Sequence, residues 1–174
     1  MIPPALVAAV LARYRLPRFG THGVGHWARV LENGRRVAAA TGASFQVVEL
    51  FALFHDSMRR NEALDPDHGR RGAELAWKLR GFNSELDDEG FGLLLEACSH
   101  HTDGGLTSDP TMGACWDADR LDLMRVGIRT NPRRLCTSAA REPSLLEWAS
   151  GQAAARVVPA LVEEEWGIRR PISS

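Results

Sequence analysis

The sequence predicts an all-α, single-domain helical bundle over its 174 residues. Apolar residues recur at intervals of three and four almost everywhere, which is typical of amphipathic helices, and alternating stretches of strand length are hard to find. The length favours one domain, against a prior of roughly 150 residues per domain. With 44% hydrophobic and 25% charged residues, the composition argues against disorder, a collagen-like fibre and a coiled coil.

The first half of the chain predicts four helices separated by loops. Their expected ranges are 3–14, 26–41, 45–58 and 68–80, with a loop rich in glycine at 16–25. The second helix is expected to end at Gly42 and the fourth at Gly81, and Asp67 can cap the first turn of the fourth. The third helix is hydrophobic nearly all round, which is typical of a central, buried helix, and it delivers His55 and Asp56 at its end.

The second half predicts three more helices. Their expected ranges are 85–101, 112–126 and 143–166, with a turn-rich stretch at 102–110. Pro159 is expected to kink or break the last helix, because proline cannot continue a helical hydrogen-bond ladder. No internal repeat, low-complexity tract or linker divides the sequence. We therefore expect residues 1–174 to form one domain, with the C-terminal helices of about 135–166 packed on the rest.

The charge balance, the apolar runs and the cysteines indicate which binding partners and which cellular compartment to expect. The chain has 21 basic and 22 acidic residues, a balance that supplies no field to attract nucleic acid or an anionic membrane. No apolar run approaches the roughly 20 residues that cross a bilayer. No charged leader precedes the first short apolar run, at 5–12. Cys98, Cys115 and Cys136 are odd in number and widely spaced, so neither a disulfide framework nor a thiolate zinc site is indicated. We expect a cytoplasmic protein with no membrane or nucleic-acid partner; the sequence predicts no oligomeric state.

The most informative residues are His55 and Asp56, which directly follow the most apolar helix. Burying a charged pair there costs several kcal/mol unless it is paired or metal-bound, although a surface pair at a helix end is the simpler alternative. Other candidate ligands stand on either side in the sequence: His22, His26, His68, His100, His101, Asp117 and Asp119.

This order of residues resembles the HD-domain superfamily of metal-dependent phosphohydrolases, in which one histidine precedes a His-Asp doublet and a distant aspartate follows on a later helix. The matching stretches are His26-Trp27-Ala28-Arg29-Val30, Leu53-Phe54-His55-Asp56 and Asp117-Ala118-Asp119-Arg120-Leu121-Asp122. The resemblance extends over about 22–127, and the strings at 22–23, 65–69 and 101–104 are similar to those of a small bacterial subgroup. The superfamily fold is a helical bundle, in agreement with the periodicity.

The resemblance implies four metal ligands: His26, His55, Asp56 and Asp119. Imidazole and carboxylate together suit a divalent transition metal such as Mn, Fe, Co, Ni or Zn. In members with two metals the doublet carboxylate bridges them and extra histidines hold the second ion. By their order in the chain, His68 and His101 match that role. Further candidates for a second metal or the substrate are His22, His100 and Asp117.

Asp117 and Asp119 compete for the last ligand position, because two residues of a helix that stand two apart are rotated by about 200°. Periodicity leaves the choice open, since both aspartates share a face with apolar residues. The resemblance selects Asp119, which stands directly before a basic residue and an apolar one. Asp117 would then orient a ligand histidine or pair with an arginine.

The resemblance implies a phosphohydrolase that acts on a small phosphorylated molecule or nucleotide. A bound ion lowers the pKa of water and polarises a phosphoryl oxygen. The expected catalytic residues are Asp56, Arg59 and His68. Arg59 follows His55 by four residues and could clamp a phosphate, and His68 could assist the leaving group or hold a second metal. Two alternatives stay open: a di-iron oxygenase with the same ligands, and a non-catalytic binding or signalling module.

Overall fold

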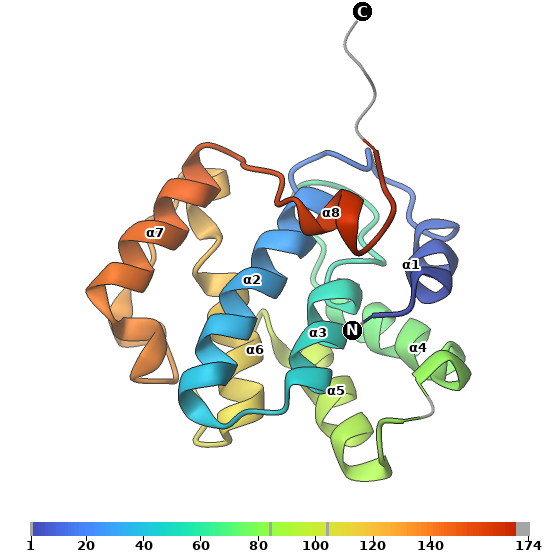
Figure 1. Ribbon diagram of the computed structural model, residues 1–174, viewed down its shortest axis with the longest axis horizontal. Helices are drawn as coiled ribbons and strands as arrows, with labels where there is room; N and C mark the ends of the chain where they lie inside the picture. The colour runs from blue at the N-terminus through green and yellow to red at the C-terminus, as the bar shows by residue number, and fades with distance from the viewer. Residues whose placement is uncertain (1, 84, 104, 170–174) are drawn as a thin grey trace, which may run out of the picture.

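Eight α-helices and four short 3₁₀ helices make up the regular structure of the computed structural model, which describes residues 2–83, 85–103 and 105–169 (Figure 1). The α-helices are α1 (Pro4–Leu11), α2 (Val24–Thr41), α3 (Phe45–Phe54), α4 (His68–Lys78), α5 (Asp88–His100), α6 (Pro110–Arg120), α7 (Pro143–Ala154) and α8 (Leu161–Glu164). The 3₁₀ helices are η1 (Arg80–Asn83), η2 (Leu123–Val126), η3 (Pro132–Arg134) and η4 (Ala139–Arg141). The described residues contain no strand, so the expected all-α class is confirmed.

Several helix ends follow from local sequence. The side chains of Ser44, Asp87 and Asp109 each accept a hydrogen bond from a backbone N–H in the first turn of α3, α5 and α6, which satisfies a donor that the helix itself leaves unpaired. Gly42 ends α2 as expected, in the left-handed conformation with φ of 74°.

Other expected helix ends are wrong. Helix α1 ends at Leu11 instead of near residue 14, and α5 begins at Asp88 instead of residue 85. Helix α4 begins without a capping hydrogen bond from Asp67, and it passes directly into η1, so Gly81 lies inside a 3₁₀ turn.

Two long expected helices are divided. The expected helix 112–126 is α6 followed by the separate turn η2. In the C-terminal range 143–166, the break comes before Pro159, because Arg156 adopts a positive φ of 49° after α7 has ended. None of the helices in the described part of the chain has the length and apolar character needed to span a bilayer.

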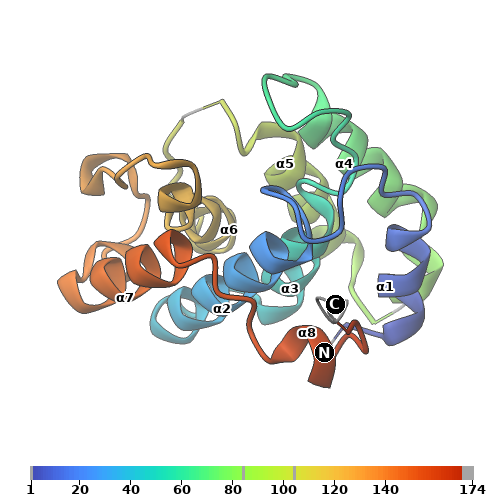
Figure 2. The ribbon, with the colours of Figure 1, turned by 90° about the horizontal axis from the view of Figure 1, so that it is seen from above.

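Helices α2 and α3 form the centre of the bundle, and α6 packs against both of them. Helix α5 packs between α3 and α4, while α7 and α8 pack on α2. Figure 2 shows α1 and α4 on one side of this central pair and α7 on the other. The core is filled by large side chains of the central helices and α5, among them Trp27, Phe51, Phe54 and Phe91. The ends of α2 and α3 that carry histidines are thereby enclosed by neighbouring helices.

Candidate metal centre

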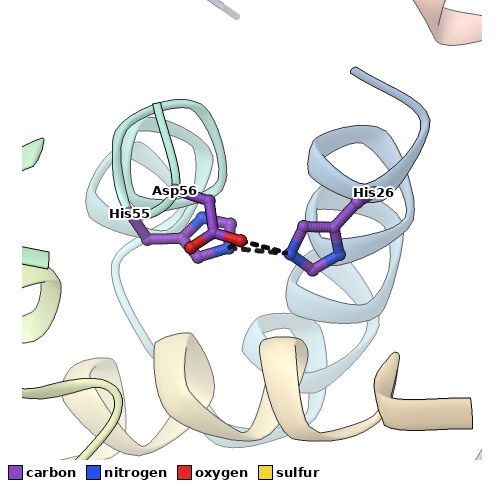
Figure 3. Close-up of side chains that lie close together, drawn as sticks. All are labelled: His26, His55 and Asp56. Carbon is purple, nitrogen blue, oxygen red and sulfur yellow. Dashed lines mark hydrogen bonds and ion pairs between the residues drawn. The ribbon is translucent and has the colours of Figure 1, made fainter. Parts of the chain in front are cut away.

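Side chains from five helices converge in the interior of the bundle. They are His26 in the first turn of α2, His55 and Asp56 directly after α3, His68 at the start of α4, His101 directly after α5, and Asp119 near the end of α6. Figure 3 shows that the doublet residues His55 and Asp56 point from the end of α3 toward His26 on α2. Except for Asp119, whose side chain is 16% exposed, all of these residues are at most 5% exposed.

The first group of possible ligand atoms surrounds His26 Nε2. It lies 3.0 Å from His55 Nε2, 3.3 Å from Asp56 Oδ2 and 3.5 Å from Asp119 Oδ1. His55 Nε2 is 3.9 Å from the same Asp119 oxygen. Donor atoms that share one ion at about 2.0–2.2 Å lie roughly 3 to 4 Å from each other, so the atoms of His26, His55 and Asp56 have the spacing of one coordination shell, and Asp119 has this spacing from both histidines.

A second group lies on the other side of the Asp56 carboxylate. His68 Nε2 is 2.9 Å from both Asp56 Oδ1 and His101 Nε2, and His101 Nε2 is 3.8 Å from Asp56 Oδ1. Asp56 therefore turns Oδ2 to the first group and Oδ1 to the second. One carboxylate joins two groups that could each hold an ion.

The hydrogen bonds of the four histidines determine which ring nitrogens carry protons. Each Nδ1 lies beside an oxygen that can only accept: Asp122 Oδ2 at 2.7 Å from His26, Phe51 O at 3.1 Å from His55, Asp65 O beside His68, and Cys98 O at 2.7 Å from His101. Each Nδ1 is therefore the donor, and each neutral imidazole presents an unprotonated Nε2.

This proton arrangement fits a bound cation. When the imidazoles are neutral, the Nε2 atoms of His26 and His55 face each other as acceptors, and so do those of His68 and His101. In addition, Asp119 Oδ1 is buried without a hydrogen-bond partner. Buried acceptors of this kind are costly unless a positive charge or a donor satisfies them, so the residues present suit divalent metal ions.

The electrostatics of the centre keep His55 neutral and both carboxylates ionised. Complete burial lowers the pKa of His55 to about 3, so this imidazole is neutral at ordinary pH. Burial by itself raises the pKa of Asp119, but Arg125 and the facing histidines outweigh it and lower the pKa to about 2. His55, His101 and His26 likewise hold the pKa of Asp56 well below its usual range against the effect of burial. Both carboxylates are therefore ionised and able to bind metal.

No family model matches the chain, and no curated protein matches it. Its structure is similar to the crystal structure of a predicted HD superfamily hydrolase from an uncultured Thermotogales bacterium. The TM-score is 0.65 and the identity 26%, over 87% of this chain and 86% of that chain. This similarity supports the assignment of the chain to the HD superfamily. Its HD doublet is His55-Asp56, which stands at the point where the two groups of possible ligand atoms meet.

The structure brings Arg59 to the HD centre, although not on a helical turn as expected, because α3 has already ended at Phe54. The guanidinium is buried, with Nη1 3.5 Å from Asp56 Oδ1 and 3.3 Å from the ring nitrogens of His68. Its Nε and Nη2 donate to the carbonyl oxygens of Asn61 and Ala63. These contacts hold the guanidinium at the second ligand group.

Three other residues considered in the sequence belong to neither group of possible ligand atoms. His22 pairs through Nδ1 with Glu62 Oε2 at 2.5 Å. His100 is exposed and pairs with Asp103 at 2.7 Å, facing away from its neighbour His101. Asp117 is buried, and it accepts hydrogen bonds from the backbone N–H groups of residues 136 and 137, so it ties down the segment after η3.

The histidine-orienting role expected of Asp117 belongs to Asp122, which the sequence analysis did not single out. Asp122 is fully buried, and its carboxylate accepts from His26 Nδ1 and from Arg29 Nε at 2.6 Å and Nη2 at 3.0 Å. A usable signal existed: Asp122 lies three residues after Asp119, one turn further along the chain. It thus belongs to the same matching stretch of sequence.

A close approach between α4 and α5 positions the second ligand group. A Cβ atom at Gly69 would lie 2.3 Å from Cys98 O and 2.9 Å from His101 Nδ1, closer than carbon can approach these atoms. At Gly72 it would lie 2.4 Å from Phe54 O. Glycine at these two positions allows the start of α4 to pack directly against backbone, and this brings His68 to His101.

Proposed function

We propose that this HD protein is a metal-dependent phosphohydrolase that acts on a small phosphorylated molecule or nucleotide. The observation that carries the proposal is the pair of buried ligand groups joined by Asp56, with unprotonated imidazole nitrogens facing each other across each group. The Thermotogales protein of similar structure is described as a predicted hydrolase, which supports a hydrolytic reaction.

One ion would be held by His26, His55, Asp56 and Asp119, and a second by Asp56, His68 and His101. Ions of this kind, when bound, lower the pKa of coordinated water and polarise phosphoryl oxygens, and histidine with carboxylate suits Mn, Fe, Co, Ni or Zn.

The other residues of the site have supporting roles. Asp122 and the backbone carbonyls that accept from each Nδ1 fix the orientation of the imidazoles. Arg59 has N–H groups beyond those given to Asn61 and Ala63, and these can donate to phosphoryl oxygens at the second group. His68 Nε2 is 2.9 Å from both Asp56 and His101, which favours a ligand role for His68 over proton transfer to the leaving group.

The test combines elemental analysis of protein purified without chelator with a screen for phosphate release from nucleotides and phosphate monoesters. We expect bound transition metal and release of phosphate from at least one substrate class. Arg59→Ala should keep its metal and lose kcat/KM, whereas Asp56→Ala should lose both metal and activity. Metal-free protein would contradict the proposed metal centre. Equal kinetics for wild type and Arg59→Ala would contradict the proposed role of Arg59.

The same measurements, with oxygen consumption and ligand binding added, separate two competing functions. Bound iron with oxygen consumption in the presence of an organic substrate, and no phosphate release, would identify a di-iron oxygenase. Tight binding of a phosphorylated ligand without turnover would identify a binding module. Either result would overturn the phosphohydrolase assignment while leaving the metal centre in place.

A further inference from the structure

A small, positively charged pocket adjoins the His26 side of the metal centre. Its volume is about 150 Å³, and it is lined by His26, Arg29, Arg125 and Arg156 together with small and apolar residues. Among the described residues that line this pocket, which we name the Arg125 pocket, none is acidic. The pocket thus places three guanidinium groups next to a ligand of the first metal.

Arg29 and Arg125 differ in how well their charges are satisfied. Arg29 donates to both oxygens of Asp122 and to Val157 O. Arg125 is also buried, with 8% exposure, but its only hydrogen bond within the described residues goes from Nη1 to the backbone oxygen of Asp122 at 3.2 Å, and its Nε has no hydrogen-bond partner. Two carboxylate oxygens lie just beyond hydrogen-bond distance, Asp119 Oδ1 at 3.7 Å from Nη1 and Asp122 Oδ2 at 3.8 Å from Nε. Asp119 is a proposed metal ligand, and Asp122 already accepts from His26 and Arg29. A buried guanidinium left in this state is costly without a further anion.

Arg156 brings a second incompletely paired charge to the same place. Its Nη2 donates to Arg125 O at 3.2 Å, and it makes no ion pair with any carboxylate in the part of the chain that the structure describes. Arg156 also has a φ of 49°, a left-handed conformation that residues other than glycine rarely adopt. This φ belongs to the turn that ends α7, in which the N–H of Val157 donates to Gln152 O at 3.1 Å.

We propose that the Arg125 pocket binds an anionic group of the substrate other than the one that reacts at the metals, so that the substrate carries two anionic groups. This inference rests on the proposed function. A volume of about 150 Å³ is well below the roughly 300–1,000 Å³ of pockets that enclose a whole small molecule, which favours a single phosphate or carboxylate. Arg125 and Arg156 offer the planar N–H groups that recognise such oxyanions.

The test measures binding, not turnover. Isothermal titration calorimetry would compare α,ω-bisphosphonates of increasing chain length with alkylphosphonates of the same length on metal-loaded protein. We expect the best bisphosphonate to bind at least about tenfold more tightly than its matched monophosphonate, and Arg125→Gln and Arg156→Gln each to remove most of that advantage. Arg133→Gln, which removes an exposed charge on η3, should retain it. Elemental analysis should give equal metal content in wild type, Arg156→Gln and Arg133→Gln.

Arg156 is exposed, so its replacement keeps the test valid even if Arg125→Gln does not fold. An absent bisphosphonate advantage in wild type, or an advantage unchanged in Arg156→Gln, would overturn the inference. Phosphate release without a bisphosphonate advantage would refute the pocket alone. A bisphosphonate advantage that depends on both arginines, with no phosphate release from any substrate, would refute the phosphohydrolase alone.

Discussion

His26 Nδ1 donates to Asp122 Oδ2 at 2.7 Å, although the two residues are 96 positions apart in the chain. The same carboxylate binds Arg29, which stands one turn after His26 on α2. The orientation of a proposed metal ligand therefore depends on a buried ion pair between α2 and the segment that joins α6 to η2. A hydrogen bond from a ligand histidine to a carboxylate fixes the ring and raises its affinity for metal.

Asp122→Asn tests this relationship. The amide is nearly the same size but carries no charge, so we expect affinity for the first metal to fall about 10- to 100-fold. Competition with a chromophoric chelator measures the change. Asp103→Asn is a suitable control, because Asp103 is an exposed carboxylate paired with His100 outside the centre. Equal metal affinity for Asp122→Asn and wild type would show that this hydrogen bond does not support the ligand.

A second prediction separates the two aspartates of α6. Asp119→Ala should lose metal and activity together, because Asp119 Oδ1 lies 3.5 Å from His26 Nε2 within the first ligand group. Asp117→Ala should keep most of its metal and instead lower the melting temperature, since its carboxylate holds backbone N–H groups of residues 136 and 137. Elemental analysis and thermal unfolding of both variants provide the measurements. The reverse pattern of metal loss would rule out Asp119 as the ligand.

The bridging position of Asp56 predicts how the number of bound ions changes on mutation. His101→Ala removes a donor that belongs to the second group alone, so the metal content should fall from two ions per chain to one. Asp56→Ala removes a donor from both groups and should leave little bound metal of either kind. Elemental analysis against protein concentration gives the stoichiometry. Equal losses in the two variants would show that Asp56 does not serve both groups.

Acid should release the two ions in separate steps, because protons compete with metal for Nε2. Burial lowers the pKa of His101, but its contact with Asp56 outweighs this and raises the pKa overall, whereas burial lowers the pKa of His55 to about 3. As the pH falls, His101 therefore takes up a proton first and the second group loses its ion first. Metal content between neutral pH and about pH 4, with circular dichroism to follow the fold, checks this order. His101→Ala should lack the first step, and a single step in wild type would contradict the prediction.

The sequence predicts the central helices well because their signals are local. The buried character of α3 follows from its apolar residues, and Gly42 ends α2 through its own backbone conformation. Local sequence signals do not predict the position of His22. A shared face with His26 requires a helix that begins before residue 22, whereas α2 begins at Val24 and leaves His22 in the preceding loop.

The remaining site residues depend on how helices meet. His100 and His101 are consecutive, and consecutive helical positions are rotated by about 100°, so only packing against α3 and α4 decides which of them faces the centre. The role of Asp122 also depends on helix packing, because its partners His26 and Arg29 come from a helix far away in sequence. Periodicity within one segment contains no information about such contacts.

The contact between α4 and α5 makes the number of metal ions sensitive to a single methyl group. Position 69 has room for hydrogen alone, since a Cβ there would come within 2.3 Å of Cys98 O. An alanine would push the start of α4, and His68 with it, away from His101, while the donors on α2, α3 and α6 would stay in place. One nucleotide change separates a glycine codon from an alanine codon, so a single mutation would turn the proposed two-metal centre into a one-metal centre.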